Sequence, residues 1–377
     1  MSKTNKPPKH STKLNYVWLD GYEQQNLRSK IKVINSKDLL WFETKNNGWV
    51  PNIGSIPQWN FDGSSTRQAP GSFSECLLQP VRVYRTIHNG SWLVLCEVLN
   101  ADGSPHTSNK RAKLRKQLDN TEDKKFWWGF EQEYFITKDF KPLGFPDGGY
   151  PKPQGLYYCG VGSNQVVGRN FVMEHLNRCL SMGITLTGVN AEVAVGQWEF
   201  QCFAKDTLKA ADDLWVSRYM MYEIAERYGY DIDISPKPVL GDWNGSGCHT
   251  NFSFKEMRKD WSEKKMKSLM NKFGKRHKEH IAGYGVDNDK RLTGDHETQH
   301  ISKFSVGVGD RGASIRIPTS MKQNNWNGYI EDRRPASNCD PYVVCKLIVE
   351  TTANEGLEKT TKTSKSKTDS ETGAGSF

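Results

Sequence analysis

The sequence predicts an α+β protein with two domains. Its 377 residues exceed the roughly 100–200 residues of a single domain. In the first third, short apolar segments alternate with turn residues, which is typical of strands; in the rest, acidic strand-like segments alternate with helical stripes. We expect a β-rich domain over 14–105 and a larger α+β domain over 106–355. A basic head (1–13) and a polar tail (356–377) are predicted to be disordered.

The N-terminal domain carries three strand signals. Residues 16–19 form an apolar run that ends at a turn pair, and Ile31 and Val33 alternate with polar neighbours. The run 92–98 is apolar throughout and is followed by a second turn at 102–103. These segments predict a small sheet.

The larger domain is predicted to open with a helix over the charged stretch 109–125. A helical stripe over 172–180 is followed by a strand-like run that carries Glu192. A long helix over 206–227 precedes another strand near Ile232. Strands that bear acidic residues therefore alternate with helices in this part of the chain.

The net charge of +9 raises the question of a nucleic-acid partner. Much of the excess lies in the head, in the tail and in the stretch 255–278. In that stretch the apolar residues recur at helical spacing, which predicts one amphipathic helix with a basic, solvated face. We therefore expect no nucleic-acid partner.

Two further features bear on the cellular environment. No apolar run approaches the about 18 residues of a membrane helix, and the lysine-rich N-terminus has no apolar segment behind it. The eight cysteines show no C-x-x-C spacing, so we expect reduced thiols rather than a zinc ribbon. These features favour a cytoplasmic protein without a membrane partner.

Carboxylates recur in short boxes between aromatic and apolar neighbours, where burying one alone is costly. Glu131 and Glu133 are two residues apart, so on a strand both point to the same face. Such a pair must share either a proton or a metal ion. Oxygen ligands with one imidazole suit Mg²⁺ or Mn²⁺. The six candidate metal ligands are Glu131, Glu133, Glu192, Glu199, His249 and Glu331.

Arginines gather in the last third of the chain. Their planar side chains can each bind two oxygens of a carboxylate or phosphate. Two metal ions beside them could bridge a nucleotide and a transferring phosphoryl group. The sequence therefore favours phosphoryl transfer. The candidate arginines are Arg291, Arg311, Arg316, Arg333 and Arg334.

Six longer sequence segments lie between 14 and 351, namely 59–66, 155–162, 241–251, 291–294, 311–318 and 331–335. Their sequences, and their order along the chain, resemble the glutamine synthetase family, of the shorter eukaryotic-type class (type II). The resemblance implies an N-terminal β-grasp domain over 14–105. It also implies a catalytic, ATP-binding domain over 106–355, in which an antiparallel sheet and helices form a funnel-shaped site.

The resemblance also implies a role for each matching residue. Two or three Mg²⁺ or Mn²⁺ ions are expected per site, with ATP as co-substrate. The metal on the glutamate side would be held by Glu133, Glu192 and Glu199, and the metal on the ATP side by Glu131, His249 and Glu331. Glutamate would be bound by Arg291, Arg333, Asn244 and Gly245. ATP and its phosphates would be bound by Ser253, Arg311, Arg316 and Arg333.

Three residues would be catalytic by the same resemblance. Asp62 would take a proton from ammonium in the site of a neighbouring subunit. Glu297 would belong to a mobile flap over the reactive intermediate, and Arg311 would stabilise the transferring group. The implied activity is ATP-dependent condensation of L-glutamate with ammonia to L-glutamine through γ-glutamyl phosphate. The implied assembly is a homodecamer of two stacked pentameric rings, with active sites between subunits.

Alternatives remain open at this point. The family resemblance does not fix the acceptor, so an amine could replace ammonia. A non-catalytic structural or regulatory homologue is a third hypothesis, although none of the expected ligands is lost. The H-E-x-x-H pattern at 296–300 follows a glycine and lacks a helical stripe, which argues against a zinc protease. The G-x-G-x-x-G pattern at 307–312 precedes a strand-like run, which argues against a dinucleotide fold.

Overall fold

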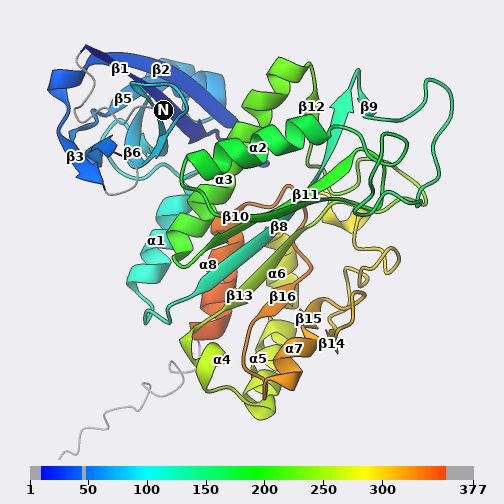
Figure 1. Cartoon of the computed structure of the whole chain (residues 1–377). Coiled ribbons are helices and arrows are strands. Elements are labelled where there is room, and N and C mark those ends of the chain that lie inside the picture. The colour runs from blue at the N-terminus through cyan, green and yellow to red at the C-terminus, as the bar shows by residue number, and fades with distance from the viewer. Residues whose placement is uncertain (1–9, 45–47, 354–377) are drawn as a thin grey trace, which may run out of the picture.

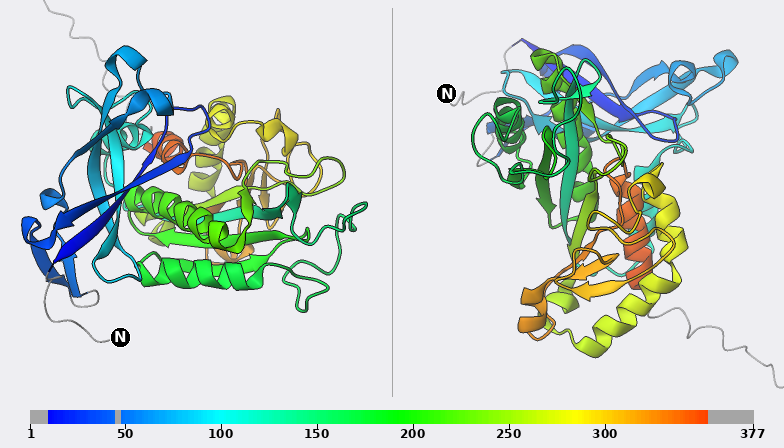
Figure 2. Two further views of the ribbon diagram at one scale, coloured as in Figure 1. Left: turned by 90° about the horizontal axis from the view of Figure 1, so that it is seen from above. Right: turned by 90° about the vertical axis from the view of Figure 1, so that its right-hand side faces the viewer.

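The computed structural model of the chain describes residues 10–44 and 48–353. A five-stranded and a nine-stranded sheet, which occupy different parts of the molecule, dominate the fold (Figures 1 and 2). A separate hairpin is formed by β3 (Trp41–Thr44) and β4 (Gly48–Pro51). Among the described helices, none is long and apolar enough to cross a membrane.

The first sheet has the strand order β2-β1-β7-β6-β5. Its strands are β1 (Ser11–Leu19), β2 (Leu27–Asn35), β5 (Trp59–Asp62), β6 (Glu75–Arg85) and β7 (Ser91–Asn100). The first and last of the long strands, β1 and β7, pair in parallel, and the other pairs are antiparallel. Alternate side chains of β1, namely Leu14, Tyr16 and Trp18, point into a buried core. The predicted strands at 16–19, 31–33 and 92–98 are confirmed.

The predicted disordered head is wrong at its last residues. Because β1 begins at Ser11, the segment up to Lys13 is part of the sheet, where Lys13 pairs with Ser91. The remaining part of the head, and the tail from 354 onward, lie outside the described residues.

The second sheet has the strand order β10-β11-β8-β13-β16-β15-β14, and β9 and β12 also pair with β8. All neighbouring strands are antiparallel except β14 and β15. The strands are β8 (Trp127–Lys138), β9 (Lys141–Pro142), β10 (Leu186–Ala191), β11 (Gln197–Ala204), β12 (Asp231–Asp233), β13 (Cys248–Ser253), β14 (Val306–Val308), β15 (Ile315–Ile317) and β16 (Ile330–Asp332).

The helices lie along the larger sheet and below it (Figure 1). They are α1 (Lys110–Asp119), α2 (Arg169–Ser181), α3 (Thr207–Tyr228), α4 (Lys255–Lys259), α5 (Glu263–Lys275), α6 (His277–Gly283), α7 (Thr319–Gln323) and α8 (Pro341–Ala353). The long helix α3 packs against β8 and β11. The Asp206 side chain accepts a hydrogen bond from the backbone N–H of Lys209 at its start, and Gly229 ends it with φ of 63°.

Two helix predictions need correction. The predicted helix 109–125 ends at Asp119, where Asn120 takes the C-cap position. The predicted single helix 255–278 is three helices, because Asp260 leaves the helical region and Ser262 caps a new start at α5. The apolar stripe of this stretch is buried on α5 as expected.

Strand β8 separates the core from a polar face. Its residues Trp128, Phe130, Gln132 and Tyr134 are fully buried. Arg218 of α3 is also fully buried and donates to the Gln132 side-chain oxygen at 2.8 and 2.6 Å. The intervening side chains of β8 therefore point to the opposite face, where the glutamates lie.

A buried carboxylate joins the N-terminal sheet to the helices. Asp212 of α3 accepts from Arg82 of β6 at 2.8 Å and from Arg111 of α1 at 2.8 and 3.0 Å. The Tyr342 hydroxyl of α8 also donates a hydrogen bond to Asp212, at 2.7 Å. Because Asp212 has no exposed surface, its charge depends on these partners.

A buried histidine should make stability depend on pH. His175 of α2 donates from Nε2 to the Ser217 carbonyl oxygen at 2.9 Å, and its Nδ1 has no partner among the described residues. Burial lowers the pKa of His175 to about 4, below the ~6.5 of an unfolded chain. The imidazole therefore favours folding fully above pH ~6.5, and this contribution is lost as the pH falls toward 4.

We expect the stability advantage of wild type over His175→Gln to shrink by about 2 kcal/mol between pH 7 and pH 5. Urea unfolding at the two pH values measures this difference. An advantage that is the same at both values would contradict the prediction.

Candidate active site

The register of the larger sheet brings the predicted ligands together. On β8, Glu131 lies opposite His249 of β13, and Glu133 lies opposite Glu199 of β11. On the other side of β13, Glu331 of β16 lies opposite both Asn251 and Arg316. Because cross-strand partners share a face, five neighbouring strands present these side chains to one side of the sheet.

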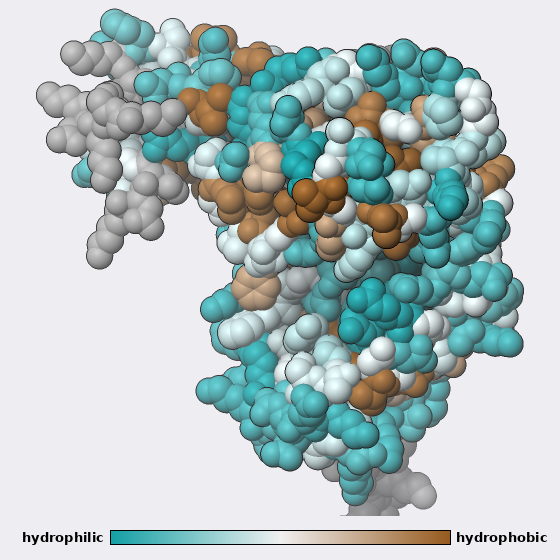
Figure 3. All heavy atoms as spheres, turned by 45° about the vertical axis from the view of Figure 1, so that its right-hand side comes forward, coloured by the Kyte–Doolittle hydropathy of each residue, from teal (hydrophilic) through white to brown (hydrophobic). Residues whose placement is uncertain are grey.

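With the exception of Asn251, these side chains line a cavity of about 400 Å³. Figure 3 shows a hollow on one face of the molecule, with hydrophilic residues below it and hydrophobic residues along its upper side. The predicted site residues that line the cavity are Glu131, Glu133, Glu192, Glu199, Asn244, Gly245, His249, Arg291, Glu297, Arg311, Arg316, Glu331 and Arg333. Asp62 and Ser253 do not line it.

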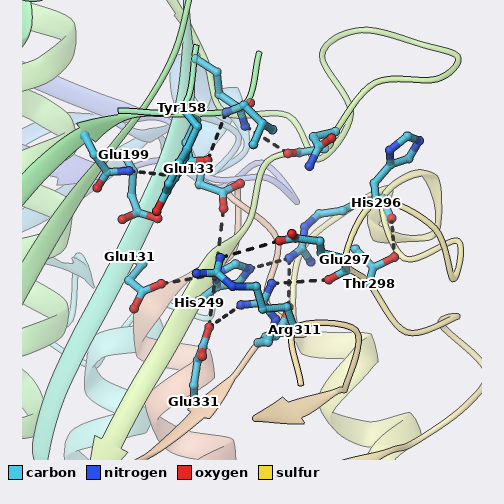
Figure 4. A pocket seen from close by; sticks show the side chains of 18 of the residues that line it. Glu131, Glu133, Tyr158, Glu199, His249, His296, Glu297, Thr298, Arg311 and Glu331 are labelled. Carbon is cyan, nitrogen blue, oxygen red and sulfur yellow. Dashed lines mark hydrogen bonds and ion pairs between the residues drawn. The ribbon is translucent and has the colours of Figure 1, made fainter. Parts of the chain in front are cut away.

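Glu131, His249 and Glu331 form the tightest cluster (Figure 4). His249 Nδ1 lies 3.4 Å from a Glu131 oxygen and 3.5 Å from a Glu331 oxygen. One ligand atom from each residue falls within 4.8 Å of the others. Two carboxylates and one imidazole at this spacing could hold a divalent cation.

The other three glutamates form a more open group. Glu133 accepts from the backbone N–H of Gly247 at 2.7 Å. Glu192, which follows the end of β10, accepts from Asn190 at 2.9 Å, and Glu199 accepts from Gln201 at 2.6 Å. Among the residues described, only the cluster of Glu131, His249 and Glu331 brings three potential metal-ligand atoms within 4.8 Å of one another.

The electrostatics of the cavity call for positive charge. Burial, followed by mutual repulsion, raises the pKa of Glu192 to about 8 and that of Glu199 to about 9. Burial also raises the pKa of Glu133 to about 7, against the opposing pull of Arg291. The pKa of His249 falls well below its usual value because of burial and the nearby arginines. A neutral imidazole beside crowded carboxylates is the protonation pattern of a metal site.

Four of the five candidate arginines reach this cavity. Arg316 and Arg333 bind Glu331 at 2.9 and 2.6 Å. Arg291 donates to the Arg333 carbonyl oxygen at 2.9 Å, and its guanidinium lies 3.0 Å from His249 Nε2. Arg311 lies 3.8 Å from Glu297. These contacts leave a cationic wall beside the glutamates.

Arg334 was predicted to join this group, and that prediction is wrong. It follows Arg333 by one residue, so it points to the other side of the chain, where it is buried. Its guanidinium binds Asp332 at 2.8 and 2.7 Å.

Residues 294–300 form turns rather than a helix. His296 and Glu297 have φ of 51° and 59°, in the left-handed region. The H-E-x-x-H pattern therefore does not place two imidazoles on one helical face, as the sequence indicated. The G-x-G-x-x-G pattern leads from β14 into β15 and opens no helix, which confirms the second exclusion.

Comparisons with known proteins agree with this geometry. The family model described as glutamine synthetase, catalytic domain, matches residues 107–370. A glutamine synthetase of Bradyrhizobium diazoefficiens is 50% identical over 354 residues, which cover 92% of this chain and 98% of that protein. The chain belongs to the glutamine synthetase family. A glutamine synthetase of Schizosaccharomyces pombe is 48% identical over 339 residues, which cover 89% of this chain and 90% of that protein.

The fold agrees with the family as well. A cryo-electron microscopy structure of Plasmodium falciparum glutamine synthetase superimposes with a TM-score of 0.70 at 18% identity, covering 93% of this chain and 72% of that one. The expected glutamine synthetase fold, a β-rich N-terminal domain followed by a catalytic domain, is confirmed.

Asp62 lies apart from the glutamine synthetase cavity of its own chain. It sits at the end of β5 in the N-terminal sheet and is exposed. Hydrogen bonds from Ser64 and Ser65, at 2.6 Å each, lower the pKa of its carboxyl to about 2. Asp62 therefore stays ionised at neutral pH.

Ser253 lines a second cavity of about 350 Å³. The wall of this second cavity is largely aromatic and includes Trp127, Phe203 and Tyr329. Glu131 and Gln201 line both cavities, so the two spaces are adjacent.

Sequence reasoning missed several cavity residues of this glutamine synthetase family member. Asn190, Gln197 and Gln201 carry amides that hold glutamates or neighbouring backbone. Gln201 follows Glu199 by two residues on β11, so strand alternation could have identified it. Tyr158 reaches the cavity from a loop, and no periodicity marks it.

Proposed function

We propose that the chain is an ATP- and divalent-metal-dependent glutamate–ammonia ligase. It would form L-glutamine through γ-glutamyl phosphate. The observation that carries the proposal is one cavity lined by six predicted metal ligands and four arginines. Membership in the glutamine synthetase family supports glutamine synthesis from glutamate.

The donor set suits two or three Mg²⁺ or Mn²⁺ ions. Oxygen donors predominate, a single imidazole joins them, and the crowded carboxylates need cations to remain ionised together. The Glu131, His249 and Glu331 cluster would hold the ion on the ATP side, and Glu133, Glu192 and Glu199 the ion on the glutamate side. When bound, such ions neutralise charge on phosphate oxygens.

Nucleotide and amino acid would approach from different sides. The aromatic cavity beside Ser253 suits a nucleotide base, and the shared wall leads the phosphates toward Arg316 and Arg333. Glutamate would lie near Asn244 and Gly245, with Arg291 binding its carboxylate. This arrangement brings the glutamate side chain to the end of the triphosphate.

The chemistry has two steps. The glutamate side-chain carboxylate attacks the γ-phosphorus of ATP, and ADP leaves. Ammonia then attacks the activated carbonyl carbon, and phosphate leaves. Arg311, Arg316 and Arg333 would stabilise the charge on the transferring group. Glu297 would close over the acyl phosphate, which water would otherwise hydrolyse.

Ammonium needs an anionic group that holds it and accepts its proton. The ionised Asp62 suits the attraction of the cation, but it lies outside the cavity of its own chain. We propose that a neighbouring subunit supplies it, in a decamer of two stacked pentameric rings. No nucleic acid or membrane is required, and a cytoplasmic location suits the substrates.

The deciding experiment measures phosphate release from ATP with Mg²⁺, omitting glutamate and ammonium in turn, and identifies the product by mass spectrometry. We expect phosphate and glutamine together only in the complete mixture. Turnover with methylamine but not with ammonium would establish an amine ligase instead. Nucleotide binding without turnover would establish a non-catalytic homologue.

Trp127 should contribute to nucleotide affinity. It is 36% exposed in the aromatic cavity, and Arg258 lies 4.2 Å from its ring centre. Stacking of a base on an aromatic ring contributes about 1–3 kcal/mol. We therefore expect Trp127→Ala to raise the KM for ATP about tenfold. Steady-state kinetics should show a smaller rise in this KM for Trp127→Phe. An unchanged KM for ATP in Trp127→Ala would show that the base does not bind in this cavity.

A further inference from the structure

Two loops meet across the mouth of the cavity. One carries Asp242, followed by Trp243 and Asn244, and the other carries His296 and Glu297 of the flap. His296 Nε2 lies 3.3 Å from a carboxylate oxygen of Asp242. The His296 side chain is only 18% exposed, whereas that of Asp242 is 90% exposed. Neither residue has a role in the proposed chemistry.

The loop of Asp242 is firmly anchored. Trp243 is 5% exposed and belongs to a small core with Phe135, Ala194 and Val239. The Lys237 ammonium donates to the carbonyl oxygen of Trp243. The Asp242 carboxylate therefore projects from a fixed position beside Asn244, which the proposed function places at glutamate.

The flap is held differently. His296 and Glu297 both adopt the left-handed region, which side chains other than glycine rarely occupy. Outside the flap, Glu297 is contacted by Arg333, which lies 3.4 Å from its carbonyl oxygen, and by Arg311, 3.8 Å from its carboxylate. The three contacts are of similar length, and the one with Asp242 ties this pair of residues to the loop that Trp243 anchors.

We infer that Asp242 is a positioning residue for the flap. Its contact with His296 fixes the neighbouring Glu297 over the cavity (Figure 4 shows these two flap residues at the edge of the site). This inference rests on the proposed function, in which the flap protects an acyl phosphate from water. Because Asp242 lies two residues from Asn244, the loop that would contact glutamate is also the loop that holds the flap.

The test compares Asp242→Ala with Asp260→Ala. Asp260 is a matched control, because its side chain is 88% exposed and lies 3.2 Å from Lys265, away from the cavity. Hydrogen exchange of the peptide spanning 292–300 is followed with ADP and Mg²⁺ present. An exposed polar contact is worth a factor of about two to five in an equilibrium, so Asp242→Ala should speed exchange by that factor. The ratio of phosphate to glutamine formed should also rise above that of wild type.

A swapped pair, Asp242→His with His296→Asp, provides the rescue. We expect it to return both exchange and the product ratio toward wild type, and Asp260→Ala to change neither. Exchange and product ratio in Asp242→Ala equal to those of wild type would overturn the inference, as would a swap that restores neither. If wild type forms no glutamine, the proposed function fails, and exchange in Asp242→Ala alone decides whether Asp242 positions the flap.

Discussion

Glu331→Gln is expected to lower the rate of glutamine formation about a thousandfold. Glu331 is 2% exposed and lies among His249, Arg316 and Arg333, at 3.5, 2.9 and 2.6 Å. A neutral amide would bring one oxygen to the metal cluster instead of a charged carboxylate. It would also leave two guanidinium groups without their anionic partner.

Titration of activity against Mg²⁺, together with calorimetric binding of Mn²⁺, measures this effect. Glu350→Gln is the control, because Glu350 pairs with Arg276 at 3.1 Å and is not among the residues that line the cavity. Unchanged Mg²⁺ dependence in Glu331→Gln would exclude Glu331 as a ligand.

Asp212→Ala should destabilise the fold by about 3–5 kcal/mol. The substitution leaves the guanidinium of Arg111, which is 10% exposed, without the carboxylate that binds it at two points. It also removes the partner of Arg82 and of the buried Tyr342 hydroxyl. Urea unfolding measures the loss.

The matched control for this substitution is Asp119→Ala, at the exposed end of α1. Surface changes of that kind usually cost less than about 0.5 kcal/mol. A loss of similar size in both variants would show that the buried carboxylate does not stabilise the joint between the N-terminal sheet and the helices.

Much of the architecture could be predicted from local pattern. The strands at 16–19 and 92–98 follow from short apolar runs bounded by turns, and the helix at 206–227 ends at a glycine; all three segments are largely buried. The stretch 255–278 misled the same reasoning, since its apolar spacing lies within α5 alone and does not mark the helix breaks on either side. Periodicity detects buried faces better than it detects ends.

The candidate site was only partly predictable. Carboxylates in apolar surroundings stand out in a sequence, so the cavity glutamates could be named. Whether Arg333 or Arg334 enters the cavity depends on how the chain continues beyond the end of β16 at Asp332, and clustering in sequence could not distinguish them. Gln201 carries no charge signal of its own, and only its alternation with Glu199 on β11 could have identified it.

The alternation along β8 limits how the protein can evolve. Glu131 and Glu133 line the cavity. Phe130 and Gln132, the residues that precede them in the strand, are buried in the core. A deletion or insertion of one residue would exchange the two sets, placing charge in the core and aromatic rings in the cavity. A one-residue insertion or deletion in β8 is therefore expected to abolish the core and the site together.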